Sequence, residues 1–262
     1  MHWLMLRLVP GLREKYCKRN NERKRVNNMI NEDYIKKMFP RGRLTILGGR
    51  PLMGKTSFVL SVVRVLNAGV LYLSLREDAS KVVRAVNMQE RRKKLLKRWS
   101  FNTCDIPGMS VEQLECLIRN HYQTIIINYV ELMNLGNDKG SKCDDRSEEL
   151  RQIYEQLDLL AKKYNCRIIG VSMLGRFSNP TVPRFEECLR FLDPNFLLER
   201  LIILHRPSKY NSKLQSAKTD YVELISKNSV GEEIVDRFSV DKNTRSIIRL
   251  MSSGKRSVGE EL

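Results

Sequence analysis

Gly49-Arg-Pro-Leu-Met-Gly-Lys-Thr56 carries the strongest motif in this chain. It matches the pattern G-x-x-x-x-G-K-[ST], in which the glycines allow successive backbone N–H groups to point at one anion. The apolar run at residues 44–47 predicts a buried strand before the loop, and residues 57–66 predict a buried helix after it. Strand, loop and helix form the context in which this pattern binds phosphate. The alternative is a chance match in a strand-to-helix turn, which leaves the agreement of both flanks unexplained.

The fixed positions of this loop have separate chemical roles. The positive end of a helix dipole lies near Lys55 and adds to the attraction for an anion. We expect the Lys55 ammonium to reach the β- and γ-phosphates and the Thr56 hydroxyl to bind Mg²⁺. The predicted ligands are therefore ATP and Mg²⁺. The predicted nucleotide-binding residues are Gly49, Arg50, Pro51, Leu52, Met53, Gly54, Lys55 and Thr56.

The charge balance of the chain points to a polyanionic partner. The 262 residues include 47 Lys and Arg against 30 Asp and Glu, which gives a formal net charge of +17. The length fits one large α/β domain, and the excess of positive charge favours nucleic acid as a partner. A basic face that binds another protein is the alternative.

Targeting and redox signals are weak. No apolar run approaches the ~20 residues that a membrane helix needs, so we expect no membrane partner. The apolar start at residues 1–6 has no basic region before it, which argues against a signal peptide. The six cysteines form no C-x-x-C pair, a pattern that favours reduced thiols in a cytoplasmic protein over a zinc site or a disulfide scaffold.

After the loop, apolar runs alternate with segments of helical pattern. Asp145 can cap an amphipathic helix at residues 146–164, and Ser110-Val-Glu-Gln113 fits a capping box. The predicted buried strands are residues 44–47, 70–75, 123–128, 167–172 and 200–205, and the alternating strands near the end are 221–227, 234–240 and 245–250. This order predicts an α/β fold with a mostly parallel sheet, helices on both faces and an antiparallel C-terminal extension.

The ends of the chain differ in composition from its middle. We expect a basic N-terminal arm at residues 1–40, one domain at 41–250 and a polar tail at 251–262. The arm is densest in Lys and Arg at residues 13–25, and a second basic block lies at 91–98. Either block is a solvated face or tail, or a contact to phosphate or to a neighbouring subunit.

The loop and its surroundings resemble the C-terminal RecA-like ATPase domain of DnaB-type replicative helicases, in which Arg-Pro-x-Met-Gly-Lys-Thr is typical. Further similar motifs follow in the family's order at residues 73–75, 105–110, 128–133 and 171–176. The resemblance covers roughly residues 41–250 and does not include the family's separate N-terminal domain. It implies a RecA-like P-loop fold, a ring of subunits with ATP between neighbours, and single-stranded DNA in the central channel.

Two acidic positions of the family are replaced in this sequence. The Walker B aspartate falls on Asn128, whose amide can accept a hydrogen bond but carries no charge, so Asn128 is a weakened magnesium residue. The catalytic glutamate falls on Arg76. Glu77 is adjacent and is the alternative catalytic carboxylate, but a shift of one residue at a strand end turns the side chain to the other face unless a bulge intervenes.

Other catalytic positions are altered as well. The glutamine that senses the γ-phosphate falls on Met173, which is nearly inert in hydrogen bonding. The trans-acting lysine of a late strand is retained at Lys227, whereas the arginine finger falls on Ser229. Such a finger is worth ~10³–10⁵ in rate. Because phosphate-binding groups remain and transition-state groups are lost, the sequence predicts nucleotide binding with poor hydrolysis, a pseudo-ATPase.

The family's DNA-contacting loops map onto residues 134–145 and 174–184. The candidates for contact with DNA phosphates are Lys139, Lys142, Arg176 and Arg184, and Phe177 is the candidate for base stacking. Ordinary exposed loop charge is the alternative for the basic residues.

Three functions fit these observations. The first is a weakened relative that binds ATP or ADP and acts on single-stranded DNA or on a helicase ring, as a homo-oligomer or in a mixed ring with a true helicase. The second is an active ATP-dependent hexameric helicase. The third is a basic DNA-binding scaffold without nucleotide. We favour the first, in DNA replication or in the maintenance of a mobile element.

Overall fold

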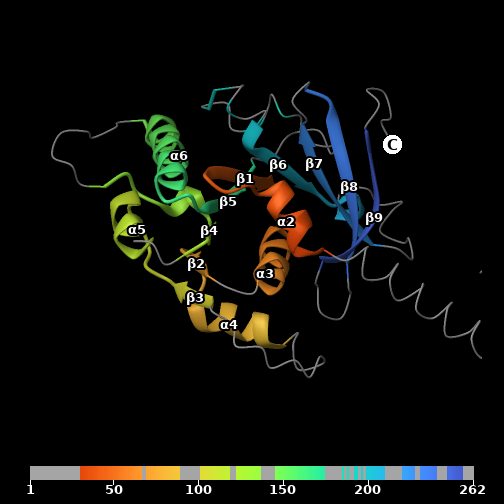
Figure 1. The fold of residues 1–262 in the computed structure, drawn as a ribbon, viewed down its shortest axis with the longest axis horizontal. Coiled ribbons are helices and arrows are strands. Elements are labelled where there is room, and N and C mark those ends of the chain that lie inside the picture. The colour runs from red at the N-terminus through yellow and green to blue at the C-terminus, as the bar shows by residue number, and fades with distance from the viewer. Residues whose placement is uncertain are drawn as a thin grey trace, which may run out of the picture.

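The computed structural model describes residues 30–66, 69–88, 101–118, 122–136, 145–174, 199–209, 220–227, 231–240 and 247–255, with single positions between 185 and 196. Within these ranges, helices lie against a central sheet (Figure 1). None of the helices in the described ranges is both long and apolar enough to cross a membrane.

One nine-stranded sheet, in the order β3-β2-β4-β5-β1-β6-β7-β8-β9, forms the centre of the domain. Strands β1 to β6 pair in parallel, and β6 to β9 pair antiparallel. The predicted parallel sheet with an antiparallel C-terminal extension is confirmed. The strands are β1 (Arg43–Gly49), β2 (Val70–Ser74), β3 (Phe101–Cys104), β4 (Thr124–Asn128), β5 (Arg167–Met173), β6 (Leu201–His205), β7 (Tyr221–Lys227), β8 (Glu233–Val240) and β9 (Ile247–Lys255).

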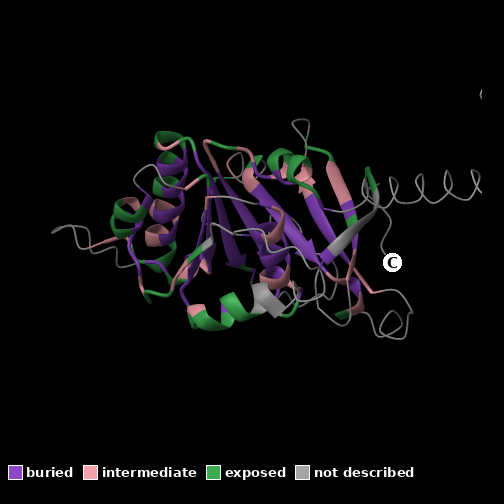
Figure 2. Cartoon of the chain, turned by 60° about the horizontal axis from the view of Figure 1, so that its bottom comes forward, coloured by how far each residue is buried: buried purple, intermediate pink, exposed green. Residues whose placement is uncertain are grey.

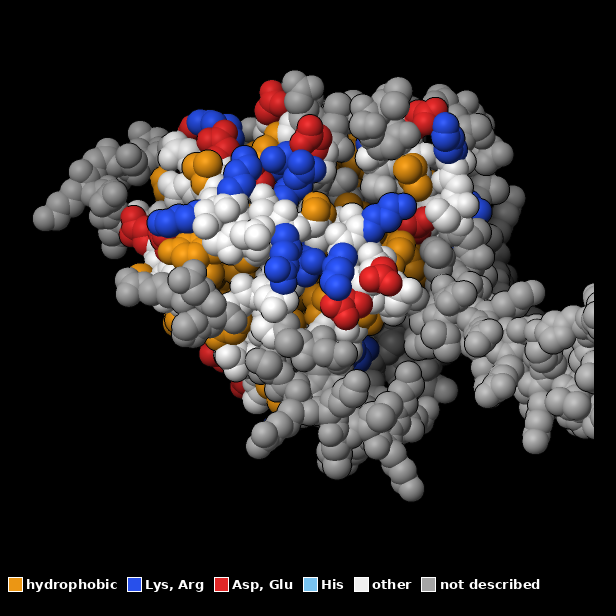
Figure 3. Space-filling view, viewed as in Figure 1, with side chains coloured by type: hydrophobic (Ala, Val, Ile, Leu, Met, Phe, Trp, Pro, Cys, Tyr) orange, Lys and Arg blue, Asp and Glu red, His pale blue; other side chains and the backbone are white. Residues whose placement is uncertain are grey.

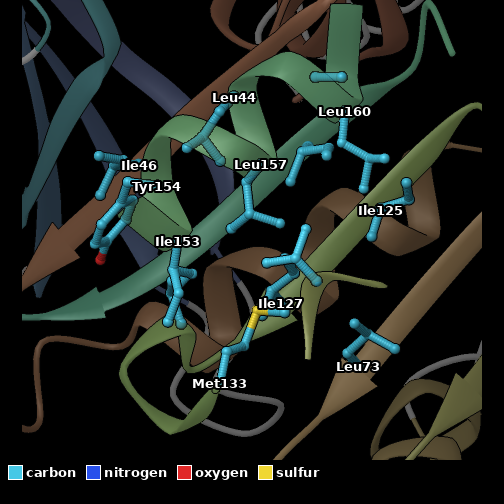
Figure 4. Close-up of a cluster of buried hydrophobic side chains, with 14 of the residues drawn as sticks. Leu44, Ile46, Leu73, Ile125, Ile127, Met133, Ile153, Tyr154, Leu157 and Leu160 are labelled. Atoms are coloured by element: carbon cyan, nitrogen blue, oxygen red, sulfur yellow. The ribbon is translucent and has the colours of Figure 1, made fainter. Parts of the chain in front are cut away.

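Helices cover both faces of the sheet, and each face has its own apolar core. The helices are α2 (Glu32–Met38), α3 (Lys55–Val65), α4 (Ala79–Met88), α5 (Val111–Ile118) and α6 (Arg146–Lys163). One core joins α5 and α6 to the sheet and includes Ile153 and Leu157 of α6 (Figure 4). The other joins α2, α3 and α4 to the opposite face. The strands between them are buried along most of their length, as continuous apolar runs predict (Figure 2).

Both helix caps that the sequence predicts are present. The backbone N–H of Ser110 donates to Gln113 Oε1 at 3.0 Å, and the Gln113 N–H donates to Ser110 Oγ at 3.2 Å. Asp145 Oδ1 accepts from the Ser147 N–H at 2.9 Å at the start of α6. These bonds satisfy N–H groups that a helix leaves without a partner in its first turn.

Residues 30–40, predicted from the sequence as part of a basic arm, pack into the domain core. Helix α2 lies within that stretch, and Ile35 and Phe39 are fully buried in the core. The Tyr34 hydroxyl donates to Asp236 on β8 at 2.6 Å, and the Phe39 and Phe58 rings lie 6.2 Å apart. Helix α2 is short and has too few apolar residues for a sequence pattern to predict this packing. Residues 1–29 lie outside the described ranges.

Two strands depart from the sequence prediction. Strand β9 continues to Lys255, five residues into the expected polar tail, and Lys255 pairs with Glu232 at 2.7 Å. The edge strand β3 pairs with β2 in parallel and was not predicted. Both are edge strands, held in the sheet by backbone hydrogen bonds to one neighbour. Such a strand can form without the continuous apolar run by which a buried strand is predicted.

Candidate functional site

The loop at residues 49–56 links β1 to α3 at the carboxyl edge of the parallel strands, as predicted. Gly54 is the N-cap of α3 and adopts φ +96°, which lies in the left-handed region that favours glycine. A Cβ on Gly49 would lie 2.8 Å from the Leu204 carbonyl oxygen of β6, so the two backbones meet too closely for a side chain. Both glycines of the motif are therefore required by the backbone path.

Lys55 is folded into the loop and is 4% exposed. Its Nζ donates to the carbonyl oxygens of Gly49 at 2.5 Å and Arg50 at 2.9 Å, and lies 5.8 Å from the centre of the Tyr129 ring. Burial lowers the pKa of Lys55 to about 8, and the charge of Glu131 opposes that change. The loop thus holds a buried ammonium on neutral carbonyl oxygens, a partner set that phosphate oxygens can replace with a stronger charge-assisted bond.

Another residue of the loop is held by the segment that follows strand β6. Met53 is 1% exposed, and its sulfur accepts from the Arg206 N–H at 3.0 Å. Arg206 forms an ion pair with Asp220, which also accepts from Ser208 Oγ at 2.9 Å. Leu52, by contrast, is 80% exposed at the tip of the loop. One side of the loop is therefore anchored in the protein, and the other is open.

Asn128 ends β4, one strand away from β1 across β5. The residue is 2% exposed, and its Nδ2 donates to the Tyr72 hydroxyl at 2.9 Å. Its Oδ1 atom is buried and has no hydrogen-bond donor in the described part of the chain. The Asn128 amide therefore presents a buried acceptor without a donor in the described ranges, and its correspondence to the family's aspartate stays a prediction.

Arg76 and Glu77 follow β2 in an exposed turn. Ser74 Oγ donates to the Glu77 carbonyl oxygen at 2.5 Å, which closes this turn. Burial raises the pKa of Tyr72 and the charge of Glu77 raises it further, while the hydrogen bond from Asn128 lowers it, so Glu77 is close enough for its charge to act on Tyr72. This placement keeps Glu77 as a candidate for the catalytic carboxylate.

Met173 ends β5 directly opposite Gly49 in the strand register. Its side chain is 38% exposed, and its backbone N–H donates to Glu131 Oε1 at 2.9 Å. Ser172 Oγ donates to the same carboxylate oxygen. The Met173 thioether is only a weak hydrogen-bond acceptor. The end of β5 is bonded by the carboxylate of Glu131, which follows β4 in the chain.

Glu131 is the site residue that sequence reasoning missed. It lies in the short turn η2 (Val130–Leu132) directly after β4. Burial raises its pKa, while the bonds from Ser172 and Met173 and the charge of Lys55 oppose that change. The sequence signal that could have identified it is a charged residue three positions after a buried strand, inside an otherwise apolar segment.

The remaining predicted residues lie away from this edge or outside the described ranges. Lys227 ends β7, and its Nζ lies 5.0 Å from the centre of the Phe185 ring; a trans-acting role for it stays a prediction. The predicted positions outside the described ranges are Lys139, Lys142, Arg176, Phe177, Arg184 and Ser229, with the basic blocks 13–25 and 91–98.

Basic side chains also gather on the face that carries α2 (Figure 3). Acidic neighbours compensate part of this charge. Lys36 pairs with Glu32 at 2.9 Å on α2, and Arg43 approaches Glu199 at 3.7 Å. Exposed pairs of this kind contribute little to stability.

The middle of the chain matches a known family of protein domains. The model of the DnaB-like helicase C-terminal domain matches residues 78–182, a range that includes β4, η2 and β5. A probable replicative DNA helicase of Trieres chinensis is 26% identical, over 74% of this chain and 50% of its own length. The replicative DNA helicase DnaB of Leifsonia xyli subsp. xyli (strain CTCB07) is 22% identical, over 64% of this chain and 44% of its own. The chain is therefore similar to the DnaB-type helicase family over this range.

Solved structures support the fold of this domain. A DnaB-like replicative helicase, described with its interactions with primase, matches with a TM-score of 0.65 and 18% identity, over 83% of this chain and 62% of its own. The RadB recombinase matches with a TM-score of 0.51 and 13% identity, over 81% and 94%. The predicted RecA-like fold is confirmed. The chain spans about half the length of the curated helicases that it matches.

Proposed function

We propose that this DnaB-type domain binds ATP or ADP with Mg²⁺ in the loop at residues 49–56 and hydrolyses ATP slowly or not at all. The observation that carries the proposal is the state of Lys55, a buried ammonium held by carbonyl oxygens inside a complete glycine loop. Buried cations need a partner of opposite charge, and a phosphate supplies it. By the family resemblance, the positions of the water-orienting glutamate, the magnesium-binding aspartate and the γ-phosphate-sensing glutamine hold Arg76, Asn128 and Met173.

The residues around the loop fit a magnesium–nucleotide complex. Thr56 lies in the first turn of α3 beside Lys55, where its hydroxyl would coordinate the ion. The buried Asn128 Oδ1, which lacks a donor within the described ranges, would accept a hydrogen bond from a water of the metal shell. When bound, the ion would neutralise charge on the phosphates.

The proposed partners are single-stranded DNA or a helicase ring, in DNA replication or mobile-element maintenance. The net charge of +17 supports a polyanionic partner. The relatives named as replicative helicases support the replication context.

Two alternatives compete with this proposal. An active hexameric helicase is favoured by Glu77, whose charge acts on Tyr72 next to Asn128. A DNA-binding scaffold without nucleotide is disfavoured, because the buried Lys55 is difficult to explain without an anionic ligand.

The proposal is tested by titrating ATP and ADP against the protein and against Lys55→Ala. We expect the substitution to abolish detectable nucleotide binding, because it removes the ammonium that meets the phosphates. Lys36→Ala, an exposed lysine on α2, is the matched control and should bind as the wild type does. Unchanged ATP affinity in Lys55→Ala would refute nucleotide binding at this loop.

A further inference from the structure

Of the described residues around the loop, Glu131 is the acid whose charge acts on Lys55. Its carboxylate accepts hydrogen bonds from Ser172 and Met173 at the end of β5. Strand β5 pairs with β1, and Met173 lies opposite Gly49. Glu131 therefore lies at the edge of the sheet where the loop begins.

Only one of the two carboxylate oxygens of Glu131 is used. Oε1 accepts both bonds from β5, whereas Oε2 is buried and has no donor in the described part of the chain. A glutamine would make the same two bonds through its own oxygen without the cost of burying a charge. The structural bonds alone thus do not account for a carboxylate at this position.

The second unused acceptor of the site comes from the same segment. Asn128 Oδ1 is buried without a donor, and Asn128 and Glu131 are separated by two residues at the end of β4. Buried acceptors are normally satisfied, so two of them in one turn point to donors other than the described residues. Waters bound to a divalent cation are such donors, and the cation also compensates the charge of a buried carboxylate.

We propose that Glu131 supplies the carboxylate that the replaced Walker B aspartate no longer provides, and that it accepts hydrogen bonds from the water shell of the nucleotide-bound magnesium ion. The inference rests on the proposed nucleotide binding. The negative charge of the metal site then comes from Glu131 in η2, and Asn128 is a neutral acceptor beside Glu131.

Glu77 is the competing acid, and its position is different. It lies in the exposed turn after β2, and it acts on Tyr72 rather than on Lys55. Glu131 is held on the other side of Asn128, against β5, which separates β4 from β1. The buried carboxylate next to the loop is therefore the better placed to carry the missing charge.

The test measures metal affinity rather than turnover. ADP is bound to the wild type and to Glu131→Gln, Mn²⁺ is titrated as a paramagnetic substitute for Mg²⁺, and free Mn²⁺ is followed by electron paramagnetic resonance. We expect Glu131→Gln to weaken Mn²⁺ binding at least about tenfold, the size of effect typical for outer-shell partners of a metal. ADP affinity in excess chelator should stay within about twofold of the wild type, because the phosphate-binding groups are unchanged.

Two further variants separate a metal role from a structural one. The double variant Asn128→Asp with Glu131→Gln moves the carboxylate to the neighbouring position and should restore Mn²⁺ affinity. Glu155→Gln, an exposed acid of α6, is the matched control and should leave Mn²⁺ affinity unchanged. If Glu131→Gln does not fold, Glu131→Asp keeps the charge but withdraws it by one methylene, and it should weaken Mn²⁺ binding in the same direction.

Specific outcomes would overturn the inference. Equal Mn²⁺ affinity in the wild type and Glu131→Gln would exclude Glu131 from the metal shell. A loss of ADP affinity that is the same with and without metal would mean that Glu131 acts only as a counter-charge for Lys55. Failure of the wild type to bind ADP under any condition would instead refute the proposed nucleotide binding itself.

Discussion

Lys55 and Asn128 are both almost completely buried, and they bear in different ways on the proposed nucleotide binding. Lys55 holds its ammonium inside the loop, and burial lowers its pKa to about 8 against the opposing charge of Glu131. Asn128 carries no charge at the position where the resemblance places an aspartate, but its Oδ1 is a buried acceptor without a donor in the described part of the chain. Binding and turnover draw on different interactions, so these two residues together are consistent with a site that binds a nucleotide and turns it over poorly.

Restoring the lost acids should raise catalysis. We expect Arg76→Glu combined with Asn128→Asp to increase steady-state ATP hydrolysis about tenfold or more, because it returns a water-positioning carboxylate and a charged magnesium partner. Lys81→Glu, an exposed charge reversal on α4, is the control for a general change in charge. No gain in the double variant would mean that another group, such as the missing arginine finger, limits the rate.

The elements of this domain follow from sequence where their patterns are strong. The continuous apolar strands, the long helix α6 and both caps were predicted, because burial and capping leave clear signals in the residues themselves. Helix α2, strand β3 and the end of β9 were missed, because tertiary packing or edge pairing holds them rather than local pattern. Glu131 was missed for a related reason, since its role depends on contacts with β5 that lies far along the chain.

Packing between β5 and η2 should be sensitive to a single methyl group. A Cβ on Gly170 would lie 2.8 Å from Val130 Cγ2, so Gly170→Ala must displace η2 or strand β5. We expect a loss of about 1–3 kcal/mol in the free energy of unfolding, typical of overpacking, measured by chemical denaturation. Gly254→Ala on β9 meets no atom within 4 Å and is the matched control. Equal stability of the two variants would contradict the packing described for η2.

The whole molecule combines a RecA-like domain with a net charge of +17. The charge excess is spread over the chain, and several of its densest blocks lie outside the described ranges. A partner that carries many negative charges is the simplest match for this distribution.

Binding to single-stranded DNA should weaken steeply as salt increases. If the charge acts on phosphates, the logarithm of the affinity falls linearly with the logarithm of salt concentration, by about 0.7 for each phosphate contact. Fluorescence anisotropy with a labelled oligonucleotide over a salt series measures this slope. An affinity that does not change with salt would contradict binding through phosphates and would favour a protein as the partner.

The most direct test of the proposed function measures ATP binding and steady-state hydrolysis on one preparation with Mg²⁺, with and without single-stranded DNA. We predict clear nucleotide binding with little turnover and no strong stimulation by DNA. The loop is complete, whereas the family's positions for the water-orienting glutamate, the magnesium-binding aspartate and the γ-phosphate sensor fall on Arg76, Asn128 and Met173. Substantial DNA-stimulated hydrolysis would contradict this prediction and would identify the domain as an active motor.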